Sequence, residues 1–202
     1  MLVLGCMICR LFICFDGSMT HYVICDLETT GLSKNRHGIT EIAAVRWDGE
    51  KEIDRFHTLV NPERHIPAMI ERLTGINNAM VANAPVMKYA LGDFFDFLGD
   101  DPLVAHNSTF DVWFLSHHGH TEVGHIFRND AICTRKLANR LLPELPSKRL
   151  EMLCQHFGIQ NMRAHRAMAD VEVTVHIFEQ FVQMLQQRDC CSLEDIVRFQ
   201  SK

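Results

Sequence analysis

The chain has 202 residues, of which 47% are hydrophobic and 22% charged, and its formal net charge is −5 at pH 7. This length and composition predict one globular domain with a substantial core and exclude a disordered or low-complexity chain. The negative net charge excludes a broad basic surface of the kind that coats nucleic acid. It leaves room for a polyanionic substrate held by a local basic rim and by metal ions.

The N-terminus is apolar, yet it does not fit a membrane or targeting segment. Residues 2–15 are interrupted by Gly5 and Arg10, and the run is shorter than the roughly 20 residues of a spanning helix. It also lacks the preceding positive charge and the small-x-small cleavage site of a signal peptide. We therefore expect residues 1–18 to be an N-terminal extension, with translation starting at Met19 as one hypothesis, and no association with a membrane.

The eight cysteines do not follow the pattern of a secreted disulfide scaffold. Cys25 and Cys133 lie in apolar, strand-like runs, and Cys154 lies in an apolar helical run. We interpret these three as reduced core thiols. A reducing, cytoplasmic compartment is the expected location.

Apolar periodicity and turn signals predict a mixed α/β domain over residues 19–188, followed by a short C-terminal tail at 189–202. Strands are expected at 22–28, 39–47 and 52–60, and the tight turns between them require antiparallel pairing. Further along the chain the pattern predicts helices at 67–73, 85–98, 108–115, 135–142, 149–157 and 167–187, with short strands at 103–105 and 131–133.

The segment Asp26–Gly31 places two carboxylates one residue apart at the end of the first predicted strand. Because side chains alternate along a strand, Asp26 and Glu28 point to the same face. Two anions held side by side repel each other unless a cation lies between them. The pair indicates a divalent-metal site, provided that the rest of the chain supplies further ligands.

Two later segments supply such ligands. His106–Asp111 runs from a predicted strand into a helix and places Asp111 in the first helical turn, where a carboxylate is favoured. In His165–Asp170, the aspartate begins the last helix and the histidine lies on the preceding loop. Four converging carboxylates are too costly to bury without a cation, and oxygen ligands suit Mg²⁺ or Mn²⁺. A neutral imidazole beside them could take a proton from water.

With these three motifs, D-x-E-T-T-G, H-N-x-x-F-D and H-x-x-x-x-D, the chain resembles the DEDD 3′–5′ exonucleases, in the DnaQ-like branch that uses histidine. The sister branch has a tyrosine four residues before its last aspartate, whereas this chain has only Tyr22 and Tyr89. The resemblance covers about residues 22–185. It implies a ribonuclease H-like α/β fold, a mixed five-stranded sheet flanked by helices, and hydrolysis of single nucleotides from a 3′ end.

The same resemblance implies roles for individual residues. Four acidic residues would hold two divalent metal ions, Mg²⁺ or in its place Mn²⁺: Asp26, Glu28, Asp111 and Asp170. His165 would be the general base. Four further residues would contact the terminal nucleotide or the path of the strand: Thr29, Thr30, Leu32 and Asn107.

Basic residues gather in one stretch of the sequence: Arg135, Lys136, Arg140, Lys148, Arg149, Arg163 and Arg166. Such residues usually form a solvated face, but near a nuclease site some of them should contact phosphates. Those contacts would reconcile a chain of negative net charge with a polyanionic substrate.

The leading hypothesis is a metal-dependent 3′–5′ exonuclease on single-stranded or frayed DNA, either free-standing or as a proofreading subunit beside a separate DNA polymerase. Trimming of RNA 3′ ends is the nearest alternative, since the groove rather than the metal site distinguishes the sugars. A catalytically silent nucleic-acid-binding or scaffold module is the alternative from another class. A homodimer is left open, and structural zinc at the histidines of residues 117–125 is a weaker hypothesis.

Overall fold

A computed structural model describes residues 14–15, 18–19 and 21–201 of the chain. Most of the expected N-terminal extension, residues 1–18, lies outside these residues. Its described part contributes to a short antiparallel pair formed by β1 (Cys14–Phe15) and β2 (Ser18–Met19). Within the described residues, no helix has the length and apolar character needed to cross a membrane.

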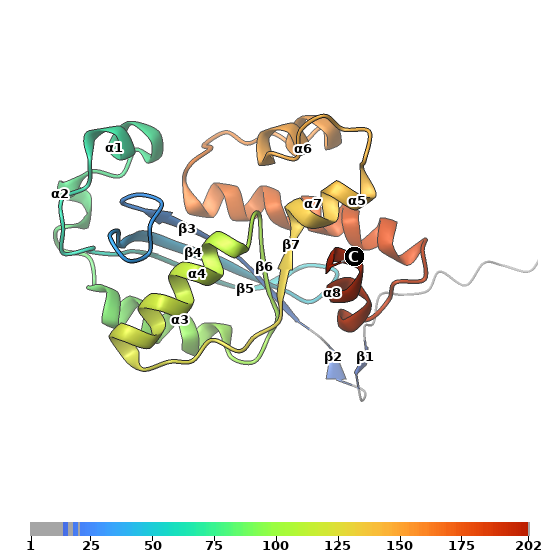
Figure 1. Ribbon diagram of the computed structural model, residues 1–202, viewed down its shortest axis with the longest axis horizontal. Helices are drawn as coiled ribbons and strands as arrows, with labels where there is room; N and C mark the ends of the chain where they lie inside the picture. Colours follow the sequence, from blue (N-terminus) through green and yellow to red (C-terminus); the bar gives the residue numbers. More distant parts are fainter. Residues whose placement is uncertain (1–13, 16–17, 20, 202) are drawn as a thin grey trace, which may run out of the picture.

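A five-stranded mixed sheet forms the centre of the molecule (Figure 1). Its strands, in spatial order, are β5 (Glu52–Leu59), β4 (Ile39–Trp47), β3 (Tyr22–Thr29), β6 (Leu103–Ala105) and β7 (Ala131–Cys133). β3, β4 and β5 are antiparallel, as the tight turns require, whereas β3, β6 and β7 are parallel. The mixed five-stranded sheet predicted from the sequence is confirmed.

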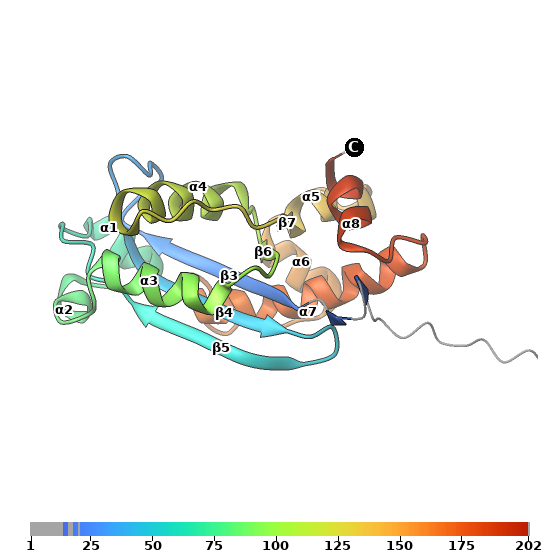
Figure 2. The same ribbon diagram turned by 90° about the horizontal axis from the view of Figure 1, so that it is seen from below.

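Helices cover both faces of the sheet (Figure 2). One face packs against α5 (Thr134–Leu141), α6 (Leu150–Phe157), α7 (Ala167–Gln186) and α8 (Leu193–Ser201). The other face packs against α3 (Met87–Leu98) and α4 (Thr109–His118). The short helices α1 (Ala68–Thr74) and α2 (Asn78–Val81) enclose a small separate cluster.

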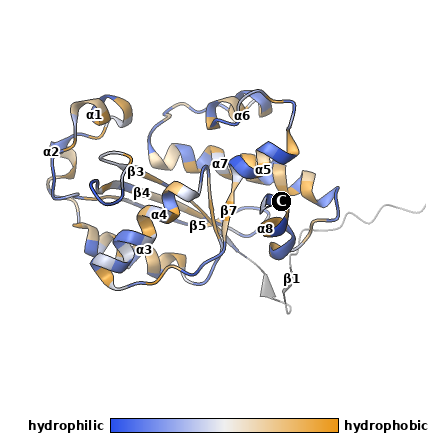
Figure 3. Cartoon of the chain, in the orientation of Figure 1, coloured by the Kyte–Doolittle hydropathy of each residue, from blue (hydrophilic) through white to orange (hydrophobic). Residues whose placement is uncertain are grey.

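The central strand β3 is apolar on both faces, because helices cover it from both sides. Tyr22 and Ile24 pack into the α7 side of the core, while Val23 and Cys25 pack into the α3 and α4 side. Figure 3 shows apolar residues along the central strands and apolar and polar residues mixed along the helices. The even-numbered side chains at the end of β3 therefore emerge toward α7. Cys25, Cys133 and Cys154 are buried free thiols, as predicted.

The segment that follows α4 has an unusual helical form. Residues Gly119–Val123 form a π-helix, η1, which continues α4 and ends at Gly124 with a left-handed φ of 69°. Gly119 is buried because α4 passes close to α3 here, and a Cβ at this position would lie 2.7 Å from the Phe95 ring. Glycine is what permits the close approach.

The C-terminal segment assigned as a tail contains α8, which packs on β7 and α5. Ile196 is buried, and the Gln200 amide pairs with the outer edge of β7. Its oxygen accepts the Cys133 N–H at 2.8 Å and its nitrogen donates to the Ala131 carbonyl at 2.8 Å. One side chain thereby satisfies backbone groups that an edge strand would leave unpaired.

The aromatic contact between the sheet and α7 predicts a large stability effect. The Phe178 ring meets Tyr22 at 5.3 Å and Trp47 at 5.8 Å, both edge to face. We expect Phe178→Ala to lower the free energy of unfolding by about 3–5 kcal/mol, since a fully buried ring leaves a cavity. Phe178→Leu should cost clearly less. Urea unfolding measures both variants, and equal losses would contradict this packing.

Candidate active site

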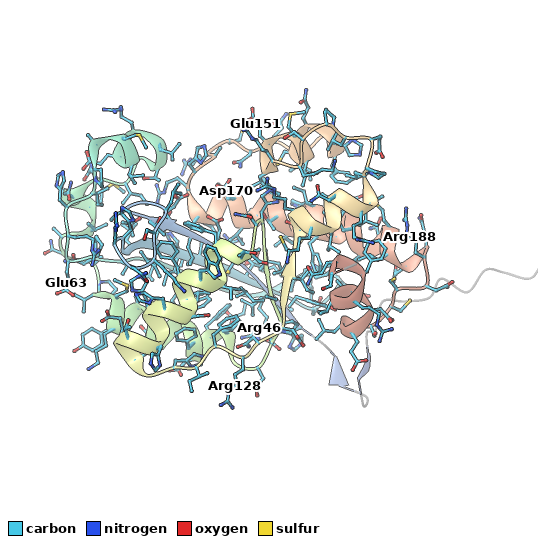
Figure 4. The ribbon with its side chains drawn as sticks, in the orientation of Figure 1. Arg46, Glu63, Arg128, Glu151, Asp170 and Arg188 are labelled. Atoms are coloured by element: carbon cyan, nitrogen blue, oxygen red, sulfur yellow. The ribbon has the colours of Figure 1, made fainter. Side chains whose placement is uncertain are left out.

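The C-terminal end of β3 meets the first turns of two helices. Asp26 and Glu28 lie on the strand face that points toward α7, and Asp170 lies in the first turn of α7. Carboxylate oxygens of these three residues lie within 4.8 Å of one another. Figure 4 labels Asp170 at the start of α7. The structure thus brings together three of the four acids that the sequence predicted as metal ligands.

The fourth predicted ligand, Asp111, lies outside this trio but beside Asp26. It is buried in the first turn of α4 and accepts a hydrogen bond from the backbone N–H of Leu27. Burial raises its pKa to about 7. Its negative charge is the largest electrostatic influence on Asp26, which raises the pKa of that carboxyl further. Asp26 is therefore close both to Asp111 and to the other two acids of the cluster, Glu28 and Asp170.

The pKa shifts show how costly the cluster is without a cation. Burial raises the pKa of Asp26 well above its ordinary value, and neighbouring acids add to the shift. Burial, followed by the charges of Asp170 and Glu41, raises the pKa of Glu28 to about 8. Burial also raises the pKa of Asp170. Glu28 would therefore hold a proton near neutral pH unless a cation replaced it, and the pKa shifts of Asp26 and Asp170 have the same direction.

The donor set fits a hard divalent cation. It offers carboxylate oxygens alone, which suits Mg²⁺, Mn²⁺ or Ca²⁺ rather than a softer metal. Across residues 21–201, Asp26, Glu28 and Asp170 are the only group of three or more His, Cys, Asp or Glu whose ligand atoms converge in this way. The weaker hypothesis of zinc at residues 117–125 receives no support from the geometry.

His165 is held beside the acids by its backbone. Its N–H donates to Asp170 Oδ2 at 3.1 Å, and the Asn161 side chain donates to Asp170 Oδ1 at 2.6 Å. His165 adopts a left-handed φ of 65°, which a non-glycine residue holds only when its surroundings enforce it. Asp170 thus closes the loop of residues 161–165 and leaves the exposed imidazole beside the cluster.

A groove of about 640 Å³ runs from this loop toward α5 and α6. Its lining includes His165 and Asp170 at the acidic end, and Arg135 and Arg149 at the helical end. Asn107, predicted to lie along the strand's path, also lines it and is exposed with a left-handed φ of 74°. The groove therefore joins the candidate base and a ligand acid to basic side chains.

The other predicted substrate contacts fall into two kinds. Leu32 is 84% exposed on the turn after β3 and is free to meet a ligand. Thr29 and Thr30 are buried, and their hydroxyls hold that turn: Thr29 Oγ1 donates to the Gly31 carbonyl at 2.7 Å, and Thr30 Oγ1 accepts the Gly38 N–H at 3.1 Å. In this structure the two threonines therefore shape the turn that presents Leu32.

A fifth acidic residue, Glu41, was missed by the sequence reasoning. It lies on β4 directly opposite Glu28 and its side chain is fully buried. It accepts hydrogen bonds from Arg166 at 2.7 and 3.2 Å, from His57 at 2.8 Å and from the Ala167 N–H at 2.9 Å. A glutamate within the apolar run of residues 39–45 was the signal that could have revealed it.

Glu41 differs from its acidic neighbours because the protein itself supplies its counter-charge, Arg166, and further hydrogen-bond donors. Burial alone would raise its pKa, but hydrogen bonds from His57, Arg166 and Ala167 lower the pKa to about 2. These bonds tie β4 to the N-terminus of α7, the helix that carries Asp170. The Arg166 charge also opposes the upward pKa shift of Glu28. Glu41 therefore positions the site without offering its oxygens to a metal.

Comparison with known proteins decides the family. The model described as Exonuclease, of the RNase T type, matches residues 23–178. The chain belongs to this exonuclease family. The DNA polymerase III subunit epsilon of Aquifex aeolicus is 35% identical over 170 residues, covering 84% of this chain and 83% of that protein. The DNA polymerase III PolC-type of Bacillus subtilis is 41% identical over 158 residues, covering 77% of this chain but only 11% of PolC.

Solved structures agree with this assignment. Exonuclease X in complex with 5′ overhanging duplex DNA superposes with a TM-score of 0.71 at 27% identity, covering 89% of this chain and 99% of that chain. E. coli Exonuclease I in complex with a dT13 oligonucleotide gives a TM-score of 0.72 at 18% identity, covering 84% and 42%, and supports the fold alone. The predicted ribonuclease H-like fold and DnaQ-like membership of this exonuclease are confirmed.

The repulsion within the acidic cluster predicts a stability change that does not depend on activity. Without metal, the folded carboxyl pKa values lie above their unfolded values, so the folded state binds more protons and loses stability as pH rises from about 4 to about 8. Asp26→Asn removes one repelling charge. We expect it to melt a few degrees above the wild type in EDTA at about pH 8, with a smaller difference at about pH 5.

Added Mg²⁺ or Mn²⁺ should raise the melting temperature of the wild type and leave Asp26→Asn nearly unchanged. Asp96→Asn, which changes an exposed acid on α3, is the matched control and should behave as the wild type. An equal metal response in Asp26→Asn and the wild type would contradict a metal site at these acids.

The buried position of Glu41 predicts a different pH dependence. Glu41→Gln leaves Arg166 without its carboxylate and should lower the free energy of unfolding by about 1–3 kcal/mol near neutral pH. Because the folded pKa of about 2 lies below the ordinary 4.5, this difference should persist above pH 4.5 and shrink as pH falls toward 2.

Urea unfolding measures the Glu41→Gln effect, and Glu52→Gln serves as the control. Glu52 pairs with Arg55 on the exposed strand β5, so its loss should cost less than about 1 kcal/mol. Similar costs for the two substitutions would show that Glu41 does not hold α7 in place.

Proposed function

We propose that this exonuclease is a divalent-metal-dependent 3′–5′ enzyme that releases nucleoside monophosphates from 3′ ends of single-stranded or frayed DNA. The observation that carries the proposal is the convergence of Asp26, Glu28 and Asp170 within 4.8 Å, beside the exposed imidazole of His165. A structural role for these acids would not explain why they form no ion pair with any described residue while neighbouring Glu41 has two basic partners.

Two metal ions would share the four predicted acids. Asp26, Glu28 and Asp170 would hold one ion, and Asp26 and Asp111 would hold the other. Mg²⁺ is the expected ion and Mn²⁺ a substitute, because the ligands are carboxylate oxygens. When bound, such a pair supplies charge that stabilises the attacking and leaving oxygens of a displacement at phosphorus.

His165 would accept the proton of the attacking water. Histidine exchanges protons near neutral pH, and the Asp170 carboxylate fixes the backbone from which this imidazole projects. The water oxygen forms a bond to phosphorus as the bond to the 3′ oxygen of the preceding nucleotide breaks. That oxygen gains a proton and leaves as a hydroxyl group. The products are a nucleoside 5′-monophosphate and a strand one nucleotide shorter.

The relatives support DNA as the substrate. Exonuclease X was solved with 5′ overhanging duplex DNA, and epsilon and PolC are named as parts of DNA polymerase III. A proofreading setting beside a separate DNA polymerase follows from those names as a proposal for this chain. The chain spans most of epsilon and a small part of PolC. Trimming of RNA 3′ ends is the competing function, and the digestion assay compares the two substrates.

Digestion of 5′-labelled oligonucleotides tests the proposal directly. With Mg²⁺ or Mn²⁺, single-stranded DNA should shorten one nucleotide at a time from its 3′ end, and an inverted 3′ linkage should block the reaction. Asp26→Ala should lower the rate by about a thousandfold or more, since it disrupts the metal site. His165→Ala should lower it by about 100- to 10,000-fold, the range for a general base.

Asp96→Ala is the control, because it removes an exposed acid on α3 and should retain full activity. EDTA should stop digestion, and excess Mg²⁺ should restore it. Undiminished activity in Asp26→Ala, or shortening from the 5′ end, would overturn the proposed function. Faster digestion of an RNA oligonucleotide than of the matched DNA would favour RNA trimming instead.

A further inference from the structure

One wall of the groove beside His165 carries two arginines, Arg135 and Arg149, and is called the basic wall. Arg135 lies in the first turn of α5, and Arg149 immediately precedes α6. Both are exposed and both line the groove. Across residues 21–201, neither side chain forms an ion pair, whereas Arg166 is paired with Glu41 and Arg140 lies over the Phe199 ring. The basic stretch of the sequence therefore divides into arginines used by the fold and arginines left for a ligand.

His106 fixes where these two arginines lie relative to the acids. Its Nδ1 is 2.9 Å from Thr134 Oγ1, and the ring also hydrogen bonds to the backbone of Lys148. Those partners are the residues directly before Arg135 and Arg149. One imidazole thus links the segment that leads into Asp111 to the starts of both helices. The basic wall is held by the same motif that carries a predicted metal ligand.

The electrostatic data agree with this placement. Burial, and then the charge of Arg135, lower the pKa of His106 to about 4. The Arg135 guanidinium is therefore close enough to the motif to influence it, and His106 is neutral near pH 7. A neutral imidazole leaves the two arginines as the positive charges of this wall.

The two sides of the site differ in chemistry. Figure 1 shows the turn after β3 and helix α1 on one side of the strand end, and α5 and α6 on the other. The first side presents the exposed apolar side chain of Leu32, which suits a base. The second presents two guanidinium groups, whose fork of N–H donors matches phosphate oxygens. A nucleic-acid strand offers both kinds of group.

We propose that Arg135 and Arg149 bind backbone phosphates of the strand on the 5′ side of the scissile bond, so that the site prefers a polynucleotide to a lone nucleotide ester. This inference rests on the proposed function. The terminal nucleotide has a single linking phosphate, and that phosphate must lie at the acidic cluster to react. Any further phosphates in the groove therefore belong to the preceding nucleotides.

The test compares two substrates in the Arg135→Gln, Arg149→Gln and double variants. One is a 5′-labelled single-stranded DNA oligonucleotide, and the other is the 4-nitrophenyl ester of thymidine 5′-monophosphate, which has no preceding nucleotides. For the oligonucleotide, the double variant should raise KM by about tenfold or more and change kcat by about twofold at most, as expected when uniform binding is lost. For the ester, kcat/KM should change by about twofold at most.

Salt dependence gives a second readout that a merely structural role would not move. Each lost phosphate contact should reduce the slope of log kcat/KM against log salt by about 0.7 for a single strand. Arg128→Gln is the matched control, since Arg128 is an exposed arginine on the segment before β7, away from the groove (Figure 4). It removes the same charge and should leave the KM and the salt slope unchanged.

The outcomes separate the inference from the function on which it rests. An unchanged oligonucleotide KM in the double variant, or an equal loss with the ester, would overturn the phosphate contacts while the exonuclease activity stands. If the wild type cleaves neither substrate, the proposed function fails. In that case, the affinity for a fluorescent oligonucleotide in Ca²⁺ still tests the phosphate contacts. We expect the double variant to bind it about tenfold more weakly than the wild type.

Discussion

Repulsion between carboxylates on neighbouring strands is the constraint on which this site depends. Asp26 and Glu28 share one face of β3, and Glu41 lies directly opposite Glu28 on β4. The fold compensates Glu41 with the Arg166 guanidinium and a hydrogen bond from His57, which keep the carboxylate ionised. It leaves the acids on β3 with raised pKa values. The same sheet therefore holds a structural acid paired with an internal cation, Arg166, beside acids whose raised pKa values favour binding of a cation from outside.

The hydrogen bonds that Glu41 accepts also determine where Asp170 and His165 lie. Its hydrogen bonds hold Arg166 and the N-terminus of α7 against β4. Asp170, one turn into that helix, then closes the loop through the backbone N–H of His165. The positions of Asp170 and His165 therefore both depend on the contact that Glu41 makes with the start of α7. A shift of this contact would move both together, which couples stability and catalysis in one element.

Local patterns in the sequence predicted where the four acids lie on their elements, because alternation on β3 and first-turn positions on α4 and α7 are set within a few residues. The role of Glu41 could not be predicted in this way, since it depends on the strand register that places this residue opposite Glu28. The pairing of Gln200 with the edge of β7 and the links from His106 to Thr134 and Lys148 join residues far apart in the chain. Tertiary contacts decide such roles.

A chain with a net charge of −5 can still bind a polyanion, provided that its positive charges are distributed unevenly. Arg55 and Arg166 form ion pairs with carboxylates of the fold, whereas Arg135 and Arg149 line a groove that ends at Asp170. Beyond about 8–10 Å at physiological salt, screening weakens the repulsion from the remaining surface acids. A strand that entered this groove would therefore meet the local pair of guanidinium groups first, and the acidic cluster would attract phosphate only with cations bound to it.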